Sequence, residues 1–400
     1  MIIQRYRSSK IASLWTEEKK FHRFLKVEKA LLASLEEEKI IPSGTSAQFD
    51  KVSINVKRIE EIEAETRHDL IAFCTSITEQ VPPEASKYFH YGVTSSDIID
   101  TALSLALKES LNVIIQDIEQ LLTTLHQLAQ DHQKTPILGR SHGMAAEPLS
   151  LGQKFLHFYA ECYRRFEDLK DFQEKELTAQ CSGAVGNYTL LTPAIENKVA
   201  SKLGLAVENV SSQIINRDHI AKLMSITANY SSFLERICIE LRHLQRSEVG
   251  EIQEGMGPFQ KGSSTMPHKK NPISAENISG LARLIRSHYQ VALENNLLWH
   301  ERDISHSSNE RLYLPDNLEL VSYTTQRLDT LLKSLIVNKD KCLENILTHY
   351  QFLSSYFLHK IIKEKNLSRE EGYKIVQTAS FQTNNLHDFL EKINYKIKID

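Results

Sequence analysis

The chain has 400 residues, of which 41% are hydrophobic and 25% charged, with a formal net charge of −3. This length allows two or three domains with a substantial buried core. The nearly balanced charge excludes proteins that gather nucleic acid or anionic membranes through a strongly basic surface, but leaves room for a local anion site. Glycine (14 residues) and proline (10 residues) are scarce, which favours an all-α fold because both residues interrupt helices.

The cysteines predict a reducing compartment. There are five, widely spaced and without a C-x-x-C pair, which argues against a disulfide framework or a zinc site: Cys74, Cys162, Cys181, Cys238 and Cys342. The N-terminus lacks the apolar core of a signal peptide, and no apolar stretch is long enough to span a bilayer. We therefore expect a soluble, cytoplasmic protein.

Apolar periodicity predicts several long helices in chain order. The first covers about residues 101–130, where eight apolar residues are spaced 4, 4, 3, 4, 3, 4 and 3. The second is expected to open at Pro148, the third to cover about 217–249, and the fourth to start near Pro272. Helical patterns also dominate before residue 95 and after residue 340. Helices of this length predict an extended bundle, plausibly shared between subunits.

The loops between these helices carry the chemistry. Residues 254–272 contain three glycines, two adjacent serines and several lysines, and an asparagine stands shortly before a predicted helix start. A helix N-terminus presents unpaired N–H groups and suits a carboxylate or phosphate. From the residues alone, the segment is either an anion-binding lid or a solvated surface loop with exposed lysines.

The eleven residues 262–272, GSSTMPHKKNP, resemble the GSSxMPxKxNP signature of the fumarase/aspartase superfamily. The resemblance implies that Ser263 is the base that removes a proton from a succinyl Cβ, although Ser264 is the other candidate. A serine becomes basic only where N–H donors and positive charge stabilise its alkoxide. Lys269, Asn271 and the helix that follows are expected to supply that environment.

Residues 139–148, GRSHGMAAEP, are similar to the GRTHGxxAEP pattern of the same superfamily. The resemblance makes His142 the general acid. Expelling an amine needs a proton donor that titrates near neutral pH, and histidine is the natural choice. A histidine that only satisfies hydrogen bonds in its loop is the alternative interpretation, which the flanking pattern disfavours.

Two further runs resemble the adenylosuccinate lyase family within that superfamily: TRHD at 66–69 and HYGVTSSD at 90–97. The resemblance implies that His68 supports the acid, that Arg67 and Asp69 belong to the substrate site, and that Thr94 and Ser95 bind carboxylates. An ion pair on a helix face and an N-cap are the alternatives, and an N-cap is compatible with a carboxylate site. His90 also matches the pattern of this family, but the resemblance implies no clear role for it.

The run WHERDISHSSNER at 299–311 is also very similar to that family. It implies that Arg302, Ser307 and Arg311 contact a nucleotide, mainly its phosphate, for which guanidinium groups are suited. An alternative of surface salt bridges is disfavoured by the length of the match. Arg5 and Tyr6 match a nucleotide-binding pair, and Gln213 matches a glutamine that binds substrate.

The resemblance covers about residues 4–380 and implies a three-domain all-α fold. The expected domains are residues 1–96, a central long-helix bundle at 97–340 with the signature loop 255–272, and an abbreviated helical domain at 341–400. Four subunits would form a twenty-helix core with shared active sites. The implied reaction is β-elimination of fumarate, from adenylosuccinate to give AMP and from succinylaminoimidazole carboxamide ribotide to give its amide, in purine nucleotide biosynthesis. No cofactor, metal, nucleic acid or membrane partner is implied.

The sequence departs from the family pattern at a few positions. Ala145 replaces a usual histidine, Ser141 a threonine, and His219-Ile220 stand where Arg-His is usual. Three alternatives stay open: another fumarate-releasing lyase or a cycloisomerase of the superfamily, a degenerate non-catalytic helical relative, and a metal-dependent hydrolase using the 16 histidines. The last lacks a paired-histidine motif with an acidic partner.

Overall fold

The computed structural model describes residues 2–257, 259 and 261–395 of the chain. The chain folds into two compact units, each assembled from three separate stretches. The first unit comprises residues 1–121, 162–235 and 278–328, and the second comprises residues 122–161, 236–277 and 329–400. The division into three domains at residues 96 and 340 stays a prediction.

The N-terminal part of the first unit is a cluster of short and medium helices. Helix α2 begins where the side chain of Thr16 accepts a hydrogen bond from the backbone N–H of Lys19, a standard N-cap. Its apolar face packs through Phe21 and Phe24 on Phe73 of α4, with ring centroids 5.9 and 5.6 Å apart. The elements are η1 Gln4–Tyr6, α1 Ser9–Ala12, α2 Glu17–Glu37, η2 Ser46–Phe49, α3 Val56–Thr66, α4 Asp69–Thr78 and α5 Pro83–Ser86.

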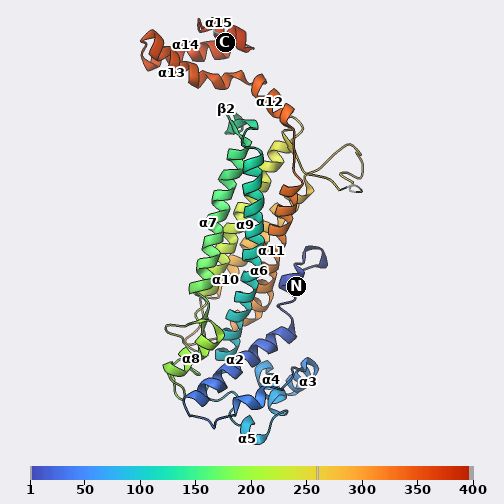
Figure 1. The fold of residues 1–400 in the computed structure, drawn as a ribbon, viewed down its shortest axis with the longest axis vertical. Coiled ribbons are helices and arrows are strands. Elements are labelled where there is room, and N and C mark those ends of the chain that lie inside the picture. The colour runs from blue at the N-terminus through green and yellow to red at the C-terminus, as the bar shows by residue number, and fades with distance from the viewer. Residues whose placement is uncertain (1, 258, 260, 396–400) are drawn as a thin grey trace. The chain divides into compact units, whose positions relative to one another are not determined.

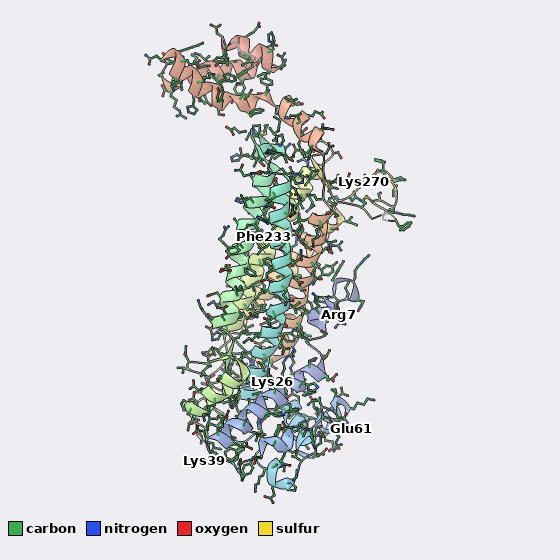
Figure 2. The ribbon with its side chains drawn as sticks, viewed as in Figure 1. Arg7, Lys26, Lys39, Glu61, Phe233 and Lys270 are labelled. Carbon is green, nitrogen blue, oxygen red and sulfur yellow. The ribbon has the colours of Figure 1, made fainter. Side chains whose placement is uncertain are left out.

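Five long helices each contribute a stretch to the first unit, where these stretches lie side by side (Figure 1). They are α6 Ser95–Asp131, α7 Leu151–Lys175, α9 Asp218–Gln245, α10 Ile273–Glu294 and α11 Ser305–Lys333. Side-chain hydrogen bonds link α7 to α6, α9 to α11, and α11 to α10. Phe233 of α9, which is 1% exposed, lies within this bundle (Figure 2). The predicted long-helix bundle is therefore confirmed.

Between α7 and α9 the first unit adds a small substructure. The strands β3 Thr178–Ala179 and β4 Ala206–Val207 pair in parallel, and α8 Pro193–Leu203 connects them. Helix α8 has Thr192 as N-cap, proline at its first position and Gly204 in the left-handed conformation at its end, a pattern that sets both helix boundaries. It packs against α2.

The second unit contains two antiparallel strand pairs and a group of C-terminal helices. The strands β1 Pro136–Ser141 and β2 Met144–Ser150 form a hairpin, and β5 Ile252–Gln253 pairs with β6 Ile336–Val337. Phe357, Ile361 and Phe389 are at the centre of a separate apolar cluster. The helices are α12 Lys339–Thr348, η3 Tyr350–Leu353, α13 Ser354–Lys365, α14 Arg369–Gln382 and α15 Leu386–Lys392.

One predicted helix start is wrong. Pro148 lies inside β2 and is paired with Leu138, and α7 begins three residues later at Leu151. The chain reverses at His142 and Gly143, which have φ of 55° and 79°. Because positive φ at both turn positions gives the hairpin turn that matches strand twist, residues 136–150 form strands before the helix can begin.

Within the described part of the chain, no helix combines the length and the apolar character needed to cross a membrane.

Candidate functional site

A pocket of about 490 Å³ lies in the first unit, and all of its lining residues belong to that unit. It is bounded by the start of α2, the α3–α4 junction, the first turns of α6 and the start of α11. Seven residues predicted from the sequence line it: Arg67, His68, Asp69, Ser95, Arg302, Ser307 and Arg311. Segments separated by more than two hundred residues are thus brought to one cavity.

The α3–α4 junction places three of these side chains together. Arg67 ends α3 with φ of 53°, a left-handed C-cap that turns the chain sharply. His68 then becomes the N-cap of α4, its Nδ1 accepting a hydrogen bond from the N–H of Ile71 at 3.4 Å. Asp69 binds Arg311 of α11 at 3.1 Å. Asp69 therefore pairs with Arg311 across the pocket, and the alternative of an ion pair between Arg67 and Asp69 is not found among the described residues.

The turn before α6 is fixed by Asp97, which the sequence analysis did not assign. Its carboxylate accepts hydrogen bonds from the N–H groups of Thr94, Ser182 and Gly183 at 2.9 to 3.3 Å. Burial raises the pKa of Asp97 to about 6, although these three donors oppose the shift. Thr94 does not line the pocket, whereas Ser95, the first residue of α6, does.

Arg302 and His306 carry buried polar atoms that are available to a ligand. One of the terminal nitrogens of Arg302 donates to Oε1 of Gln213 at 3.0 Å, which connects two predicted site residues. Its Nε and the Nδ1 of His306 are buried without a hydrogen-bond partner among the described residues. Burial and the charge of Arg217 lower the pKa of His306 to about 4, so its ring is neutral. Buried polar atoms of this kind normally have partners.

Under the pocket lies a buried ionic network that sequence reasoning missed. Arg217 donates to both oxygens of Asp100 at 2.8 and 2.9 Å and to Glu310 at 2.9 Å. All three side chains are under 10% exposed. Burial raises the pKa of Glu310 to about 7, while the charge of Arg217 opposes that shift. The only sequence signal for this network was Arg217 itself, a charged residue directly before a helix with many apolar residues.

Two N-terminal residues lie outside the pocket lining. Arg5 is exposed in η1, and Tyr6 packs on Tyr323 of α11 with ring centroids 5.7 Å apart. Neither contacts another predicted site residue in the described part of the chain.

The remaining four predicted residues belong to the second unit. His142 occupies the tip of the β1–β2 hairpin and is exposed. The hairpin is anchored by Arg140, two residues before His142, whose guanidinium binds the fully buried carboxylate of Glu251 through two bonds of 2.8 Å. The hairpin therefore presents an imidazole from a rigid support.

The signature loop places Ser263 in a network of backbone hydrogen bonds. The Oγ of Ser263 accepts from the N–H groups of Thr265 at 3.3 Å and Met266 at 3.1 Å. Asn271 donates to the carbonyl of Gly262 at 2.9 Å, and a Cβ at Gly262 would lie 2.1 Å from the carbonyl oxygen of Lys269. Residues 258 and 260 of this loop lie outside the described residues.

The start of α10 does not offer the anion site expected from the sequence. The carboxylate of Glu254 accepts from the N–H groups of Ser274 at 3.0 Å and Ala275 at 2.8 Å. Glu254 is buried, and its negative charge already interacts with the helix dipole. The donors that reach Ser263 come from its own loop instead, and Lys269 is exposed there.

A cation-binding group can also be formed by Glu28, Cys74 and His90, which lie in the first unit. None of these three residues lines the pocket.

Comparison with known proteins gives a consistent relationship. A protein-family model described as "Lyase" matches residues 4–286. An adenylosuccinate lyase of Thermotoga maritima is 42% identical, covering 98% of this chain and 91% of the relative. An adenylosuccinate lyase of Helicobacter pylori strain 26695 is 41% identical, covering 94% and 86%.

Solved structures show the same fold. A fumarate lyase from Mesorhizobium sp. BNC1 has a TM-score of 0.87 at 22% identity, covering 98% of this chain and 91% of that one. A 3-carboxy-cis,cis-muconate lactonizing enzyme from Pseudomonas putida has a TM-score of 0.83 at 24% identity, covering 94% and 86%. The predicted all-α fumarase/aspartase-like fold is confirmed.

Proposed function

This chain belongs to the adenylosuccinate lyase family of the lyases, and we propose that it is a C–N lyase that releases fumarate from adenylosuccinate, giving AMP. We propose the same elimination for succinylaminoimidazole carboxamide ribotide. Both substrates combine a succinyl group with a phosphorylated ribose, so the site must bind carboxylates and a phosphate.

The observation that carries the proposal is the polar lining of the pocket. Arg67 and Arg302 both line it without an acidic partner among the described residues, and His306 adds a buried ring nitrogen that lacks a hydrogen bond. A guanidinium group binds a phosphate or carboxylate through paired N–H donors. A pocket of 490 Å³ is within the range for a nucleotide-sized ligand.

The proposed reaction is a general acid–base elimination. Ser263, as alkoxide, removes the Cβ proton of the succinyl group, and the electron pair forms the double bond of fumarate as the C–N bond breaks. His142 gives its proton to the leaving nitrogen, with His68 supporting the acid. The N–H groups of Thr265 and Met266 already bind the Oγ of Ser263 and would stabilise its negative charge.

Substrate groups are assigned to the other predicted residues. Ser95 and Thr94, with Lys269 and Asn271, would hold carboxylates. The nucleotide, mainly its phosphate, would be bound by Arg302, Ser307 and Arg311, and Arg5 and Tyr6 would also contact the nucleotide. Arg67, Asp69 and Gln213 would complete the substrate site. Because Arg311 is paired with Asp69, we expect the phosphate to compete for Arg311 on binding.

We also propose a homotetramer in the cytoplasm, with active sites built from more than one subunit. Support comes from the exposed apolar side chains that follow the long helices, including Leu156, Tyr163, Ile239 and Leu284. Exposed apolar residues in such numbers on long helices are typical of subunit interfaces.

The first prediction is that the purified protein lowers the absorbance of adenylosuccinate while fumarate appears in equal amount. Ser263→Ala and His142→Ala should each lose at least about a thousandfold in kcat, because each removes a proton-transfer group. A matched pair, Ser264→Ala and His387→Ala, should keep nearly the full rate; His387 is 79% exposed.

Other outcomes identify the alternatives. Activity on argininosuccinate or a carboxymuconate without activity on adenylosuccinate would assign another reaction of the superfamily. Absence of fumarate with every substrate would indicate a non-catalytic relative, and loss of turnover on chelation would indicate metal-dependent chemistry. A rate lost in Ser264→Ala and kept in Ser263→Ala would move the base to Ser264.

A further inference from the structure

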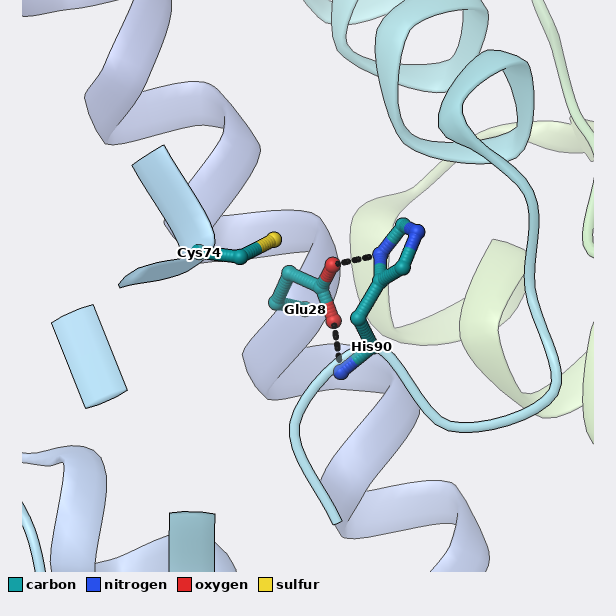
Figure 3. A group of neighbouring side chains, drawn as sticks. All are labelled: Glu28, Cys74 and His90. Carbon is teal, nitrogen blue, oxygen red and sulfur yellow. Dashed lines mark hydrogen bonds and ion pairs between the residues drawn. The ribbon is translucent and has the colours of Figure 1, made fainter. Parts of the chain in front are cut away.

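Three residues far apart in the sequence meet at one point in the N-terminal part of the first unit. Glu28 lies in the middle of α2, Cys74 in α4, and His90 in the turn that precedes α6. Figure 3 shows the Cys74 thiol and the His90 ring directed at the carboxylate of Glu28 from two sides. One donor atom from each residue lies within 4.8 Å of the other two.

The central carboxylate is completely enclosed. The side chain of Glu28 is 0% exposed, and that of His90 is 26% exposed. Nδ1 of His90 lies 2.7 Å from one oxygen of Glu28, and the backbone N–H of the same residue donates to the other oxygen at 3.2 Å. His90 has a φ of 62°, a strained conformation for a residue with a side chain, and this conformation directs both of its groups to Glu28.

The cluster holds two protons that a cation could replace. Burial and the negative charge of Glu28 raise the pKa of the Cys74 thiol, so the thiol stays protonated. Burial alone would lower the pKa of His90, but the hydrogen bond and charge of Glu28 and the charge of Asp97 raise it overall. A second proton is therefore held between His90 and Glu28.

We propose that Glu28, Cys74 and His90 form a binding site for Zn²⁺, with water as the fourth ligand on the side where His90 is exposed. A set of one thiolate, one imidazole and one carboxylate favours zinc over Mg²⁺ or Ca²⁺, which prefer oxygen ligands. Zinc–ligand distances of about 2.0–2.3 Å place neighbouring ligand atoms about 3.5 Å apart. The three side chains therefore need to approach one another only by rotamer adjustments.

This site has a structural connection to the pocket without belonging to it. The turn that carries His90 continues through Thr94 to Ser95, and Ser95 lines the pocket. A zinc ion would tie that turn to α2 and α4. The wide spacing of the five cysteines, without a C-x-x-C pair, argued against a zinc site, whereas the fold brings Glu28, Cys74 and His90 together from three separate segments.

The test is a titration of the metal-free, full-length protein with Co²⁺, which substitutes for Zn²⁺ and has an absorption spectrum. We expect one ion per chain, tetrahedral ligand-field bands, a thiolate-to-cobalt charge-transfer band, and release of protons into a weakly buffered solution. Zn²⁺ should displace the cobalt and remove the spectrum. Cys74→Ser should abolish the charge-transfer band and weaken binding at least about tenfold.

Cys342→Ala is the matched control. Cys342 is also buried near a carboxylate, Glu251, and its thiol pKa is also raised, to about 11, but among the described residues it belongs to no group of side chains that could hold a metal ion. This variant should bind Co²⁺ with the wild-type spectrum. Folded wild-type protein without a thiolate–cobalt band, or a Cys74→Ala variant that keeps the band, would overturn the proposal. Fumarate release measured on the same samples reports the lyase activity separately.

Discussion

At the residue scale, Arg302 shows how the pocket is prepared for an anion. Its Nε is buried without a partner among the described residues, and one of its terminal nitrogens donates a hydrogen bond to Gln213. A planar guanidinium can satisfy the free N–H groups on a phosphate, whereas an ammonium group offers a single charged point. The arrangement favours binding of a dianion over a structural role.

Arg302→Lys is therefore expected to raise KM for adenylosuccinate about 10- to 100-fold with a smaller effect on kcat, because phosphate contacts persist through the reaction. Steady-state kinetics at a fixed ionic strength measure this. Arg369→Lys, at the exposed start of α14, is the control and should leave both constants unchanged. An unaltered KM in Arg302→Lys would remove Arg302 from the phosphate site.

At the element scale, α6, α9 and α11 are joined by the buried network of Arg217. Asp100 is on α6, Glu310 is on α11, and Arg217 directly precedes α9. Removal of the arginine would leave two buried carboxylates without their cation. Arg217→Met should therefore lower the free energy of unfolding by about 3–5 kcal/mol.

Urea denaturation followed by circular dichroism tests this value. Arg58→Met is the matched control, because Arg58 pairs with Glu79 at the surface, where the side chains are 44% and 43% exposed. Such exposed pairs contribute about 0–1 kcal/mol. Equal losses in the two variants would show that the buried network contributes no more than a surface pair.

A second link between elements depends on pH. His219 at the start of α9 contacts Glu208 after β4 at 3.2 Å and Glu176 after α7 at 2.9 Å. The bond to Glu208 is the largest cause that raises the pKa of His219, ahead of the opposing effect of burial. The stabilisation is complete below the unfolded-state value of about 6.5 and is lost as pH rises through the higher folded-state value.

His219→Gln should accordingly lower Tm most at about pH 6 and progressively less toward pH 9. The neighbouring carboxylates Glu176 and Glu208 keep their charges over this interval, since their pKa values are lowered. His387→Gln, an exposed histidine near Glu391, provides the reference. A Tm difference that is constant with pH would show that the charge of His219 contributes nothing.

At the scale of the whole molecule, the proposed shared active sites have a direct test. If His142 and Ser263 of one site come from different subunits, mixing inactive His142→Ala and Ser263→Ala proteins should create sites with both residues intact. Random reassembly of equal amounts would restore about a quarter of the sites. The measurement is fumarate release after mild dissociation and reassociation.

The same treatment of each variant by itself is the control and should yield no activity. If the mixture also stays inactive although hybrid oligomers are detected by mass spectrometry, the two residues belong to one subunit in each site. The lyase proposal would survive that result, but the shared-site proposal would not.

The helices were largely predictable from the sequence because apolar periodicity is a local property. The seam at 101–130 corresponds to α6, which extends from Ser95 to Asp131, and the helix expected near Pro272 begins at Ile273. The motifs also named seven of the residues that line the pocket. The helix start predicted at Pro148 is wrong, because strand pairing with Leu138 outweighs the preference of proline for the first position of a helix.

The sequence by itself thus determined the helical class, the family and the candidate chemical groups, because these depend on residue types and short spacings. Only the tertiary structure decided that Asp97 binds the N–H groups of Ser182 and Gly183, that Glu254 occupies the start of α10, and that Arg217 compensates Asp100 and Glu310. It also brought Glu28, Cys74 and His90 together. These contacts join residues far apart in the chain, and a buried charge receives its partner from packing between elements, which no local pattern records.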